Sequence, residues 1–209
     1  ARDNIPGINR GIMFAIYNTN KYGVTLNLKH PRAVELARGL AKWSDVVIEN
    51  FTPGTLARLG LGYDDLRQTR AGLVMLSTCN MGQTGPHAGH PGYGSHLTFL
   101  SGFGHLTGWP DRPPVLLYGP YVDMISAAFC SSALIAALDH RHRTGQGQYI
   151  DVSQYEAGLQ FMIPALLEYQ VNGRLMSREG NRSPHAAPHG AYPCRDEDRW
   201  CVIAVWSDE

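Results

Sequence analysis

The stretch "KWSDVVIENFTPGTLARLG", residues 42–60, decides the fold class of this chain. Its centre, "DVVIENF" (45–51), carries an unbroken "VVI" run, which predicts a strand covered on both faces, as in a parallel sheet. The proline and glycine that follow mark a turn, and "PGTLARLGL" (53–61) predicts a short helix. A buried strand that leads through a turn into a helix is the repeating unit of α/β proteins.

The same alternation continues on both sides. Upstream, "GVTLNL" (23–28) predicts another strand, and "HPRAVELARGLAKW" (30–43) predicts a helix with Pro31 in its first turn. Downstream, "GLVMLSTCN" (72–80) and "QYIDVS" (148–153) predict two further strands with helical segments between them. The predicted fold class is therefore α/β, with a Rossmann-like, doubly wound, mostly parallel sheet.

The domain organisation follows from the later part of the chain. We expect a large domain over residues 1–155, a linker helix over 156–178, and the start of a smaller α+β domain over 179–209. A polar, turn-rich tract marks the crossing, and "AYPCRDEDRWCVIAVW" (191–206) predicts a hairpin. The chain stops just after this strand-like run, where a domain seldom ends, so we expect a fragment of a longer protein.

Composition limits the partners. Eighteen Lys and Arg balance eighteen Asp and Glu, which gives no electrostatic case for nucleic acid or an anionic membrane. The longest apolar run, Met124–Leu138, is short for a membrane span and contains serines. The four cysteines form no C-x-x-C pair, and Pro184 and Pro188 disfavour the helix that would pair His185 with His189. We therefore expect no metal site and a reduced, cytoplasmic protein.

Asp123 stands before fifteen apolar or small residues, at the mouth of a predicted helix. Two interpretations remain open from the residues alone. In the first, the side chain caps the helix by accepting hydrogen bonds from backbone N–H groups of the first turn. In the second, it is a nucleophilic or basic carboxylate that the helix dipole keeps ionised.

Asn50 and Phe51 end a predicted strand, where doubly wound folds place ligands. Arg58 follows on the next short helix and could pair with a phosphate, while Phe51 could stack on a purine. The alternative is that none of the three binds a ligand: Asn50 caps the strand end, Phe51 fills apolar space, and Arg58 is solvated. Lys29 at a strand end and Tyr93 in the "PGYG" turn (91–94) offer the same choice between a ligand contact and an ordinary surface role.

Several motifs together resemble one family. "NTNKYGVTLNLKHP", "DVVIENFTPGTLARLGLGYDDL", "GQTGP", "HPGYG", "YVDMISA", "RTGQGQYIDVS" and "GNRSPHAAPHGAYPCRD" run in the order and spacing of the class III CoA-transferases, the formyl-CoA transferase-like enzymes. The resemblance covers nearly the whole chain. The combination of "ENFTPG…RLGLGY" with "RTGQGQYIDVS" is its most specific part.

The resemblance implies an enzyme that moves coenzyme A from an acyl-CoA to a free carboxylic acid. An aspartate in the place of Asp123 attacks the thioester and forms a mixed anhydride and then an aspartyl-CoA thioester. No tightly bound cofactor is implied, since coenzyme A and acyl-CoA are substrates. The CoA contacts of the family fall, position by position, on Leu26, Asn27, Leu28, Lys29, Asn50, Phe51, Arg58 and Tyr93.

Departures from the family pattern bear on the substrate. The glycine-rich flap of the oxalate-using members is replaced here by "SPHAAPHG" (183–190), which argues for a larger acid and makes His185 and His189 candidates for recognising it. Members often carry an acidic residue after the tyrosine of "PGY", and this chain has Gly94.

Two alternative functions remain open. The first is an α-methylacyl-CoA racemase, although the place of that enzyme's histidine holds Tyr93 here. The second is a CoA-binding relative without activity. Full-length members of the family form interlaced homodimers, so the resemblance also implies a second copy of the chain as partner.

Overall fold

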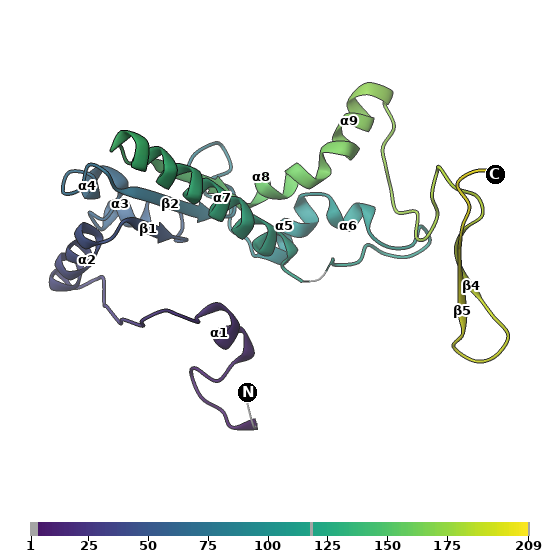
Figure 1. Ribbon diagram of the computed structural model, residues 1–209, viewed down its shortest axis with the longest axis horizontal. Coiled ribbons are helices and arrows are strands. Elements are labelled where there is room, and N and C mark those ends of the chain that lie inside the picture. Colours follow the sequence, from purple (N-terminus) through teal and green to yellow (C-terminus); the bar gives the residue numbers. More distant parts are fainter. Residues whose placement is uncertain (1–3, 118, 209) are drawn as a thin grey trace.

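The structure is a computed structural model that describes residues 4–117 and 119–208. Residues 1–3, Tyr118 and Glu209 lie outside this range. The elements, shown in Figure 1, are α1 (Ile12–Tyr17), α2 (Pro31–Trp43), β1 (Val46–Glu49), α3 (Thr55–Arg58), α4 (Tyr63–Leu66), β2 (Val74–Cys79), α5 (Gly94–Leu100), α6 (Phe103–Leu106), α7 (Tyr121–Thr144), β3 (Tyr149–Ser153), α8 (Gln154–Leu159), the 3-10 helix η2 (Gln160–Met162), α9 (Ile163–Asn172), β4 (His189–Pro193) and β5 (Trp200–Ala204).

Strands β1, β2 and β3 form a parallel sheet in that order. Ile48 of β1 stands opposite Leu76 of β2, and Leu76 stands opposite Ile150 of β3. The central strand is buried on both faces, because consecutive residues Val74, Met75 and Leu76 are at most 2% exposed and alternate between the faces. The predicted α/β class is confirmed with a parallel sheet, whereas the Rossmann-like, doubly wound arrangement stays a prediction.

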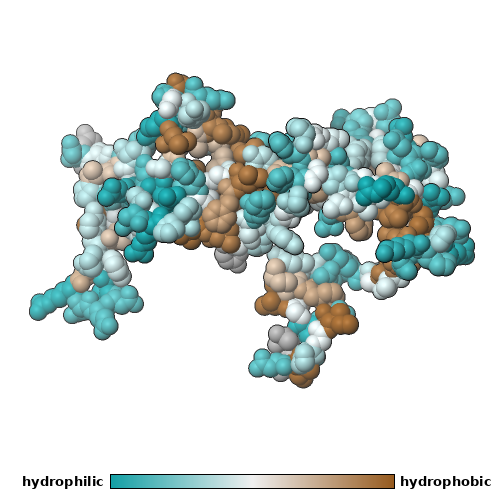
Figure 2. Space-filling view, turned by 180° about the vertical axis from the view of Figure 1, so that it is seen from behind, coloured by the Kyte–Doolittle hydropathy of each residue, from teal (hydrophilic) through white to brown (hydrophobic). Residues whose placement is uncertain are grey.

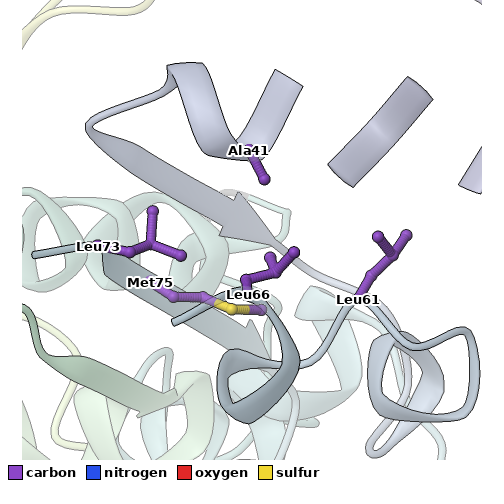
Figure 3. Close-up of a cluster of buried hydrophobic side chains, with 5 residues drawn as sticks. All are labelled: Ala41, Leu61, Leu66, Leu73 and Met75. Carbon is purple, nitrogen blue, oxygen red and sulfur yellow. The ribbon is translucent and has the colours of Figure 1, made fainter. Parts of the chain in front are cut away.

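A hydrophobic core joins this sheet to the helices before and after β1. Figure 3 shows its five buried side chains, which come from α2, the segment before α4, α4 itself, the residue before β2, and β2: Ala41, Leu61, Leu66, Leu73 and Met75. Helix α2 begins as predicted, with Pro31 in its first turn and the His30 ring accepting a hydrogen bond from the Arg32 N–H at 3.2 Å. This core fixes where β1 ends.

A second core lies around the start of α7. Leu97 of α5, Phe103 of α6 and Val122 of α7 are buried together, and the Tyr121 ring packs edge-on against Phe103 with centroids 5.4 Å apart. The Thr98 hydroxyl accepts a hydrogen bond from the Val122 N–H at 3.4 Å. These contacts place the first turn of α7, and with it Asp123, beside α5.

The strand predicted over residues 23–28 is wrong. The structure has no strand there, and the first strand among the described residues is β1. The segment is unevenly buried, because Leu28 packs against the first core while Val24 is 71% exposed. A strand also needs a hydrogen-bonding neighbour, and β1 pairs only with β2 within the described residues.

Helix α7 is longer than the apolar run in the sequence suggests. Its 24 residues satisfy the length and composition of a membrane span, a test that core helices of soluble proteins also pass. The helix packs on β2, β3, α5 and α8 in this structure. Several of its apolar side chains nevertheless face solvent, among them Phe129 and Ile135.

The end of the chain departs from the sheet (Figure 1). The predicted linker helix is interrupted before Pro164, as expected. Helix α8 ends at Leu159, η2 ends at Met162, and α9 begins at Ile163.

The predicted hairpin is confirmed, with β4 and β5 antiparallel and Tyr192 opposite Cys201. Figure 2 shows apolar patches on the surface, and exposed apolar side chains of α9 include Leu166, Leu167 and Tyr169. The domain boundaries stay predictions.

Candidate functional site

A cavity of about 500 Å³ lies where the strands of the parallel sheet end. Four parts of the chain line it: residues 50–53 after β1, residues 78–80 at the end of β2, the loop 88–94, and single side chains from α7 and α8, Asp123 and Gln154. The carboxyl ends of parallel strands are the usual ligand position in open α/β sheets. The cavity brings together four of the predicted site residues, namely Asn50, Phe51, Tyr93 and Asp123.

The capping interpretation of Asp123 is wrong. Helix α7 begins at Tyr121, Pro120 is its N-cap residue, and Asp123 is the third residue of the helix. The helix starts earlier than the sequence suggested because Pro120 already supplies the carbonyl that accepts from the Asp123 N–H, at 3.0 Å. Among the described residues, no donor bonds to the Asp123 carboxylate. The side chain is therefore free for a chemical role.

Glycine is required next to this carboxylate. Gly94, the first residue of α5, lies so close that a Cβ built on it would be 2.6 Å from Asp123 Oδ1 and closer still to Oδ2. The Asp123 carboxylate thus occupies space that a side chain at Gly94 would fill. Any side chain at this position would require the Asp123 carboxylate to move from where it lies here.

The electrostatic environment of Asp123 differs from the expectation. Partial burial removes water from the carboxyl and raises the pKa of Asp123 above its usual value. The helix dipole, which the nucleophile interpretation invoked, favours the ionised form and therefore opposes this shift. A carboxylate that is less well solvated than usual is also less stabilised as an anion, which favours its reaction as a nucleophile.

Asn80 holds the loop that carries Tyr93. Its side-chain amide donates to the Gly92 carbonyl at 2.9 Å, and its own carbonyl accepts from the Tyr155 N–H at 2.9 Å. His90 lines the cavity and stacks on His96 with ring centroids 6.4 Å apart. Tyr93 itself is largely exposed, so its ring is open to a ligand.

Arg58 does not line the cavity but braces the segment that does. Its guanidinium donates to the Pro53 carbonyl at 3.3 Å and to the Thr55 hydroxyl at 2.9 Å. Arginine has five N–H donors, so these two bonds leave others for an anion. The Arg58 side chain and the ring of Phe51 are both exposed to solvent.

Four predicted CoA contacts lie away from the cavity. Leu26, Asn27, Leu28 and Lys29 form the turn that leads into α2, and none of them lines the space around Asp123. The Asn27 side chain accepts from the Lys29 N–H at 3.2 Å. Their role as CoA contacts stays a prediction.

The two candidate histidines of the hairpin region are also elsewhere. His185 lines a separate cavity of about 380 Å³ together with Trp206. The His189 ring lies 2.7 Å from the Asn181 carbonyl and packs edge-on against Trp206. Neither histidine lines the cavity around Asp123.

Sequence reasoning missed several residues that the cavity contains: Thr78, Cys79, Asn80, His90 and Gln154. The sequence did carry a signal for three of these residues. Ligands bind at the carboxyl ends of parallel strands, and the strand predicted over 72–80 ends at Thr78, Cys79 and Asn80, just as the strand before it ends at Asn50. Burial raises the pKa of the Cys79 thiol, so this cysteine is protonated near neutral pH and is a poor nucleophile. Within the described residues, no three His, Cys, Asp or Glu side chains are grouped to hold a metal ion.

Comparison with known families and proteins identifies relatives. The family described as "CoA-transferase family III" matches residues 2–209. Succinyl-CoA--D-citramalate CoA-transferase of Chloroflexus aurantiacus is 37% identical over 199 residues, which is 95% of this chain and 49% of that protein. Acetyl-CoA:oxalate CoA-transferase of Acetobacter aceti is 34% identical over 90% of this chain and 49% of that protein.

A solved structure has the same fold. The CAIB/BAIF family protein from Brucella suis superposes with a TM-score of 0.80 at 32% sequence identity, covering 87% of this chain and 47% of that one. The chain thus spans about half the length of the curated and structural relatives it matches.

Proposed function

The chain belongs to CoA-transferase family III, and from this we propose that it carries the nucleophile and part of the CoA site of an acyl-CoA:carboxylate CoA-transferase. The observation that supports the proposal most strongly is the cavity at the strand ends. It places Asp123, whose carboxylate has no hydrogen-bond donor among residues 4–117 and 119–208, in the same space as the exposed ring of Phe51 and the side chain of Asn50. A nucleophile and a platform for a purine are the two elements that such an exchange requires.

The proposed reaction proceeds through Asp123. Its carboxylate attacks the thioester carbonyl, the C–S bond breaks, and CoA thiolate leaves a mixed anhydride behind. The thiolate then attacks the aspartyl carbonyl, releasing the donor acid and forming an aspartyl-CoA thioester. The acceptor carboxylate attacks this thioester, the C–S bond breaks, and a second mixed anhydride forms as CoA thiolate leaves. The thiolate then attacks the acceptor carbonyl of this anhydride, which gives the new acyl-CoA and restores the Asp123 carboxylate. Because a carboxylate is a weak nucleophile, the enzyme gains from placing it and from dividing one exchange into several steps.

The acceptor is proposed to be a carboxylic acid larger than oxalate, with the other half of the enzyme and a second copy of the chain completing the pocket. The relatives named above act, by their names, on succinyl-CoA with citramalate and on acetyl-CoA with oxalate. A screen of the full-length enzyme with succinyl-CoA against mono- and dicarboxylic acids, oxalate included, identifies the acceptor.

Hydroxylamine trapping tests the covalent step directly. We expect incubation of the full-length protein with acyl-CoA and hydroxylamine to convert Asp123 to a hydroxamate, seen as a mass shift on its peptide. CoA binding without this adduct would instead indicate a binding protein without transferase activity. Uptake of deuterium at the α-carbon of a chiral acyl-CoA, without acceptor acid, would indicate a racemase. A racemase needs a base such as a histidine, and His90 lines the cavity.

Replacing Arg58 with alanine should weaken CoA binding by about tenfold, and more at low salt than at high salt. The reason is that the exposed guanidinium would pair with a phosphate of CoA, and a hydrogen bond to a charged group contributes about 1.5–3 kcal/mol. The measurement is calorimetric titration with CoA at two salt concentrations. Arg67→Ala is the matched control, since Arg67 is also exposed and pairs with Asp64 at 3.1 Å. Equal affinities for the Arg58 variant and the parent would contradict the phosphate contact.

The pH dependence of the rate follows from the raised pKa of Asp123. Only the ionised carboxylate attacks, so kcat/KM should fall as the pH drops through this pKa, with a midpoint above 3.8, the ordinary value for aspartate. The same shift means that the folded state disfavours the charge, so this carboxyl lowers stability as pH rises above 3.8. Asp123→Asn should therefore melt at a higher temperature than the parent near pH 7, and this difference should vanish below pH 3.8. A variant that melts lower at pH 7 would contradict the desolvation.

A further inference from the structure

Gln83 joins three separate parts of the chain behind the cavity wall. Its backbone N–H donates to both carboxylate oxygens of Asp151 on β3, each at 2.9 Å. Its side-chain amide donates to Glu49 Oε1 at 3.2 Å, and its side-chain oxygen accepts from the Gly54 N–H at 3.1 Å. The amide thus has its donor facing a carboxyl and its acceptor facing an N–H, which satisfies both ends.

Glu49 completes the connection. It is the last residue of β1, is only 8% exposed, and accepts from the Phe51 N–H through Oε2 at 2.8 Å. Within the described residues, no cationic side chain pairs with it, so N–H donors alone satisfy this buried carboxyl. A buried acceptor that loses a donor costs about 1–3 kcal/mol, so the arrangement is sensitive to each bond.

The bonds from Glu49 and Gln83 end on the two sides of one segment, residues 50–53. The Phe51 N–H is held at its start and the Gly54 N–H directly after its end. Gly54 adopts a positive φ of 71°, a conformation that needs support when the chain turns sharply into α3. Residues 50–53 line the Asp123 cavity, and Arg58 bonds to the carbonyl of the last of them, Pro53.

We propose that Gln83 and Glu49 are positioning residues that hold the segment 50–54, and through it Phe51 and Arg58, in the geometry that binds the nucleotide end of CoA. Neither lines the cavity that contains Asp123, so neither is expected to act on the reacting carbonyl. The inference rests on the proposed function, since it assigns these residues to the CoA site. It predicts an effect on CoA binding that is separate from the chemical step.

The first experiment substitutes Gln83 with leucine, which keeps the volume and removes both side-chain bonds. We expect KM for acyl-CoA and the dissociation constant for CoA to rise by about tenfold, while kcat changes by less than about threefold. Gln68→Leu is the matched control, because Gln68 is an exposed glutamine whose amide also bonds to a backbone carbonyl, that of Asp64. An unchanged KM in the Gln83 variant, or an equal rise in the control, would overturn the proposal.

The second experiment exchanges the two residues. Gln83→Glu alone places two carboxyls against each other and should raise KM at least as much as leucine does. The double variant Glu49→Gln with Gln83→Glu restores a donor opposite a carboxyl and still offers acceptors to the N–H groups of Phe51 and Gly54. We expect it to return KM to within about threefold of the parent. A double variant no better than Gln83→Glu would contradict the pairing.

A third readout does not depend on activity. In Gln83→Leu, amide hydrogen exchange should accelerate at Gly54 and Phe51, the two N–H groups that the pair fixes, and stay unchanged in β2. If the parent fails to bind CoA, the proposed function fails, while the exchange data still test the positioning. Unchanged exchange at both amides would overturn the positioning role whatever the kinetics show.

Discussion

Replacing Asp123 with asparagine is expected to lower kcat for CoA exchange by about 10³-fold or more. Asparagine has nearly the same shape but cannot form the anhydride, so the chemical step is lost while the cavity stays filled. The dissociation constant for CoA should remain within about twofold, because the proposed role of Asp123 is to attack the thioester and that of Phe51 is to bind the nucleotide end. Both quantities are measured on the full-length enzyme, by thioester exchange and by calorimetry.

Asp139→Asn provides the comparison for this variant. Asp139 is on the same helix, about 24 Å along its axis, and pairs on the surface with Arg143 at 2.9 Å. Its substitution should leave kcat unchanged, since exposed pairs within a helix contribute little. Normal exchange rates in the Asp123 variant would refute the covalent mechanism, whatever the family membership.

Replacing Gly94 with alanine is the second change with a large expected effect. The new Cβ would fall 2.6 Å from Asp123 Oδ1, whereas real Cβ atoms essentially never come closer than 3.0 Å. The carboxylate must move aside, and a displacement of about 1 Å at a reacting group costs roughly 10²-fold in rate. We expect kcat to fall by about 10- to 10²-fold, with little change in CoA affinity.

Stability measurements separate this effect from unfolding. Gly94 begins α5 and its φ lies outside the positive region, so alanine suits the backbone and should not lower the melting temperature. Gly39→Ala is the matched control, since Gly39 lies within α2 with nothing within 4 Å of the added Cβ. The control should keep full activity. A Gly94 variant with normal kcat would show that the carboxylate does not need this position.

The local parts of the fold could be predicted from the sequence. The "VVI" run gave β1, and the motif "QYIDVS" gave β3, because a short apolar run between turns has few alternatives. The strand expected over 23–28 failed because pairing depends on a distant neighbour, which no local pattern shows. The apolar run ends at Leu138, but α7 continues through polar residues to Thr144.

The candidate site divides in the same way. Asp123, Asn50 and Phe51 could be found from motifs, since each stands at the end of a recognisable element. Gln83 and Gly94 could not, because their importance lies in contacts across the chain: one with Asp151, 68 positions later, and one with the carboxylate of Asp123. The placement of Asp123 inside the helix, rather than as its cap, also depended on Pro120 and not on the apolar run.

The bond between Gln83 and Asp151 has a consequence during synthesis on the ribosome. At about 5–20 residues per second, the 68 residues between them require roughly 3–14 seconds to emerge. During that interval residues 50–54 and Gln83 have already been synthesised, but Gln83 cannot yet bond to Asp151 of β3. If CoA binds at this segment as proposed, a nascent chain acquires the supported binding geometry only after β3 has been made, because Gln83 is anchored on Asp151.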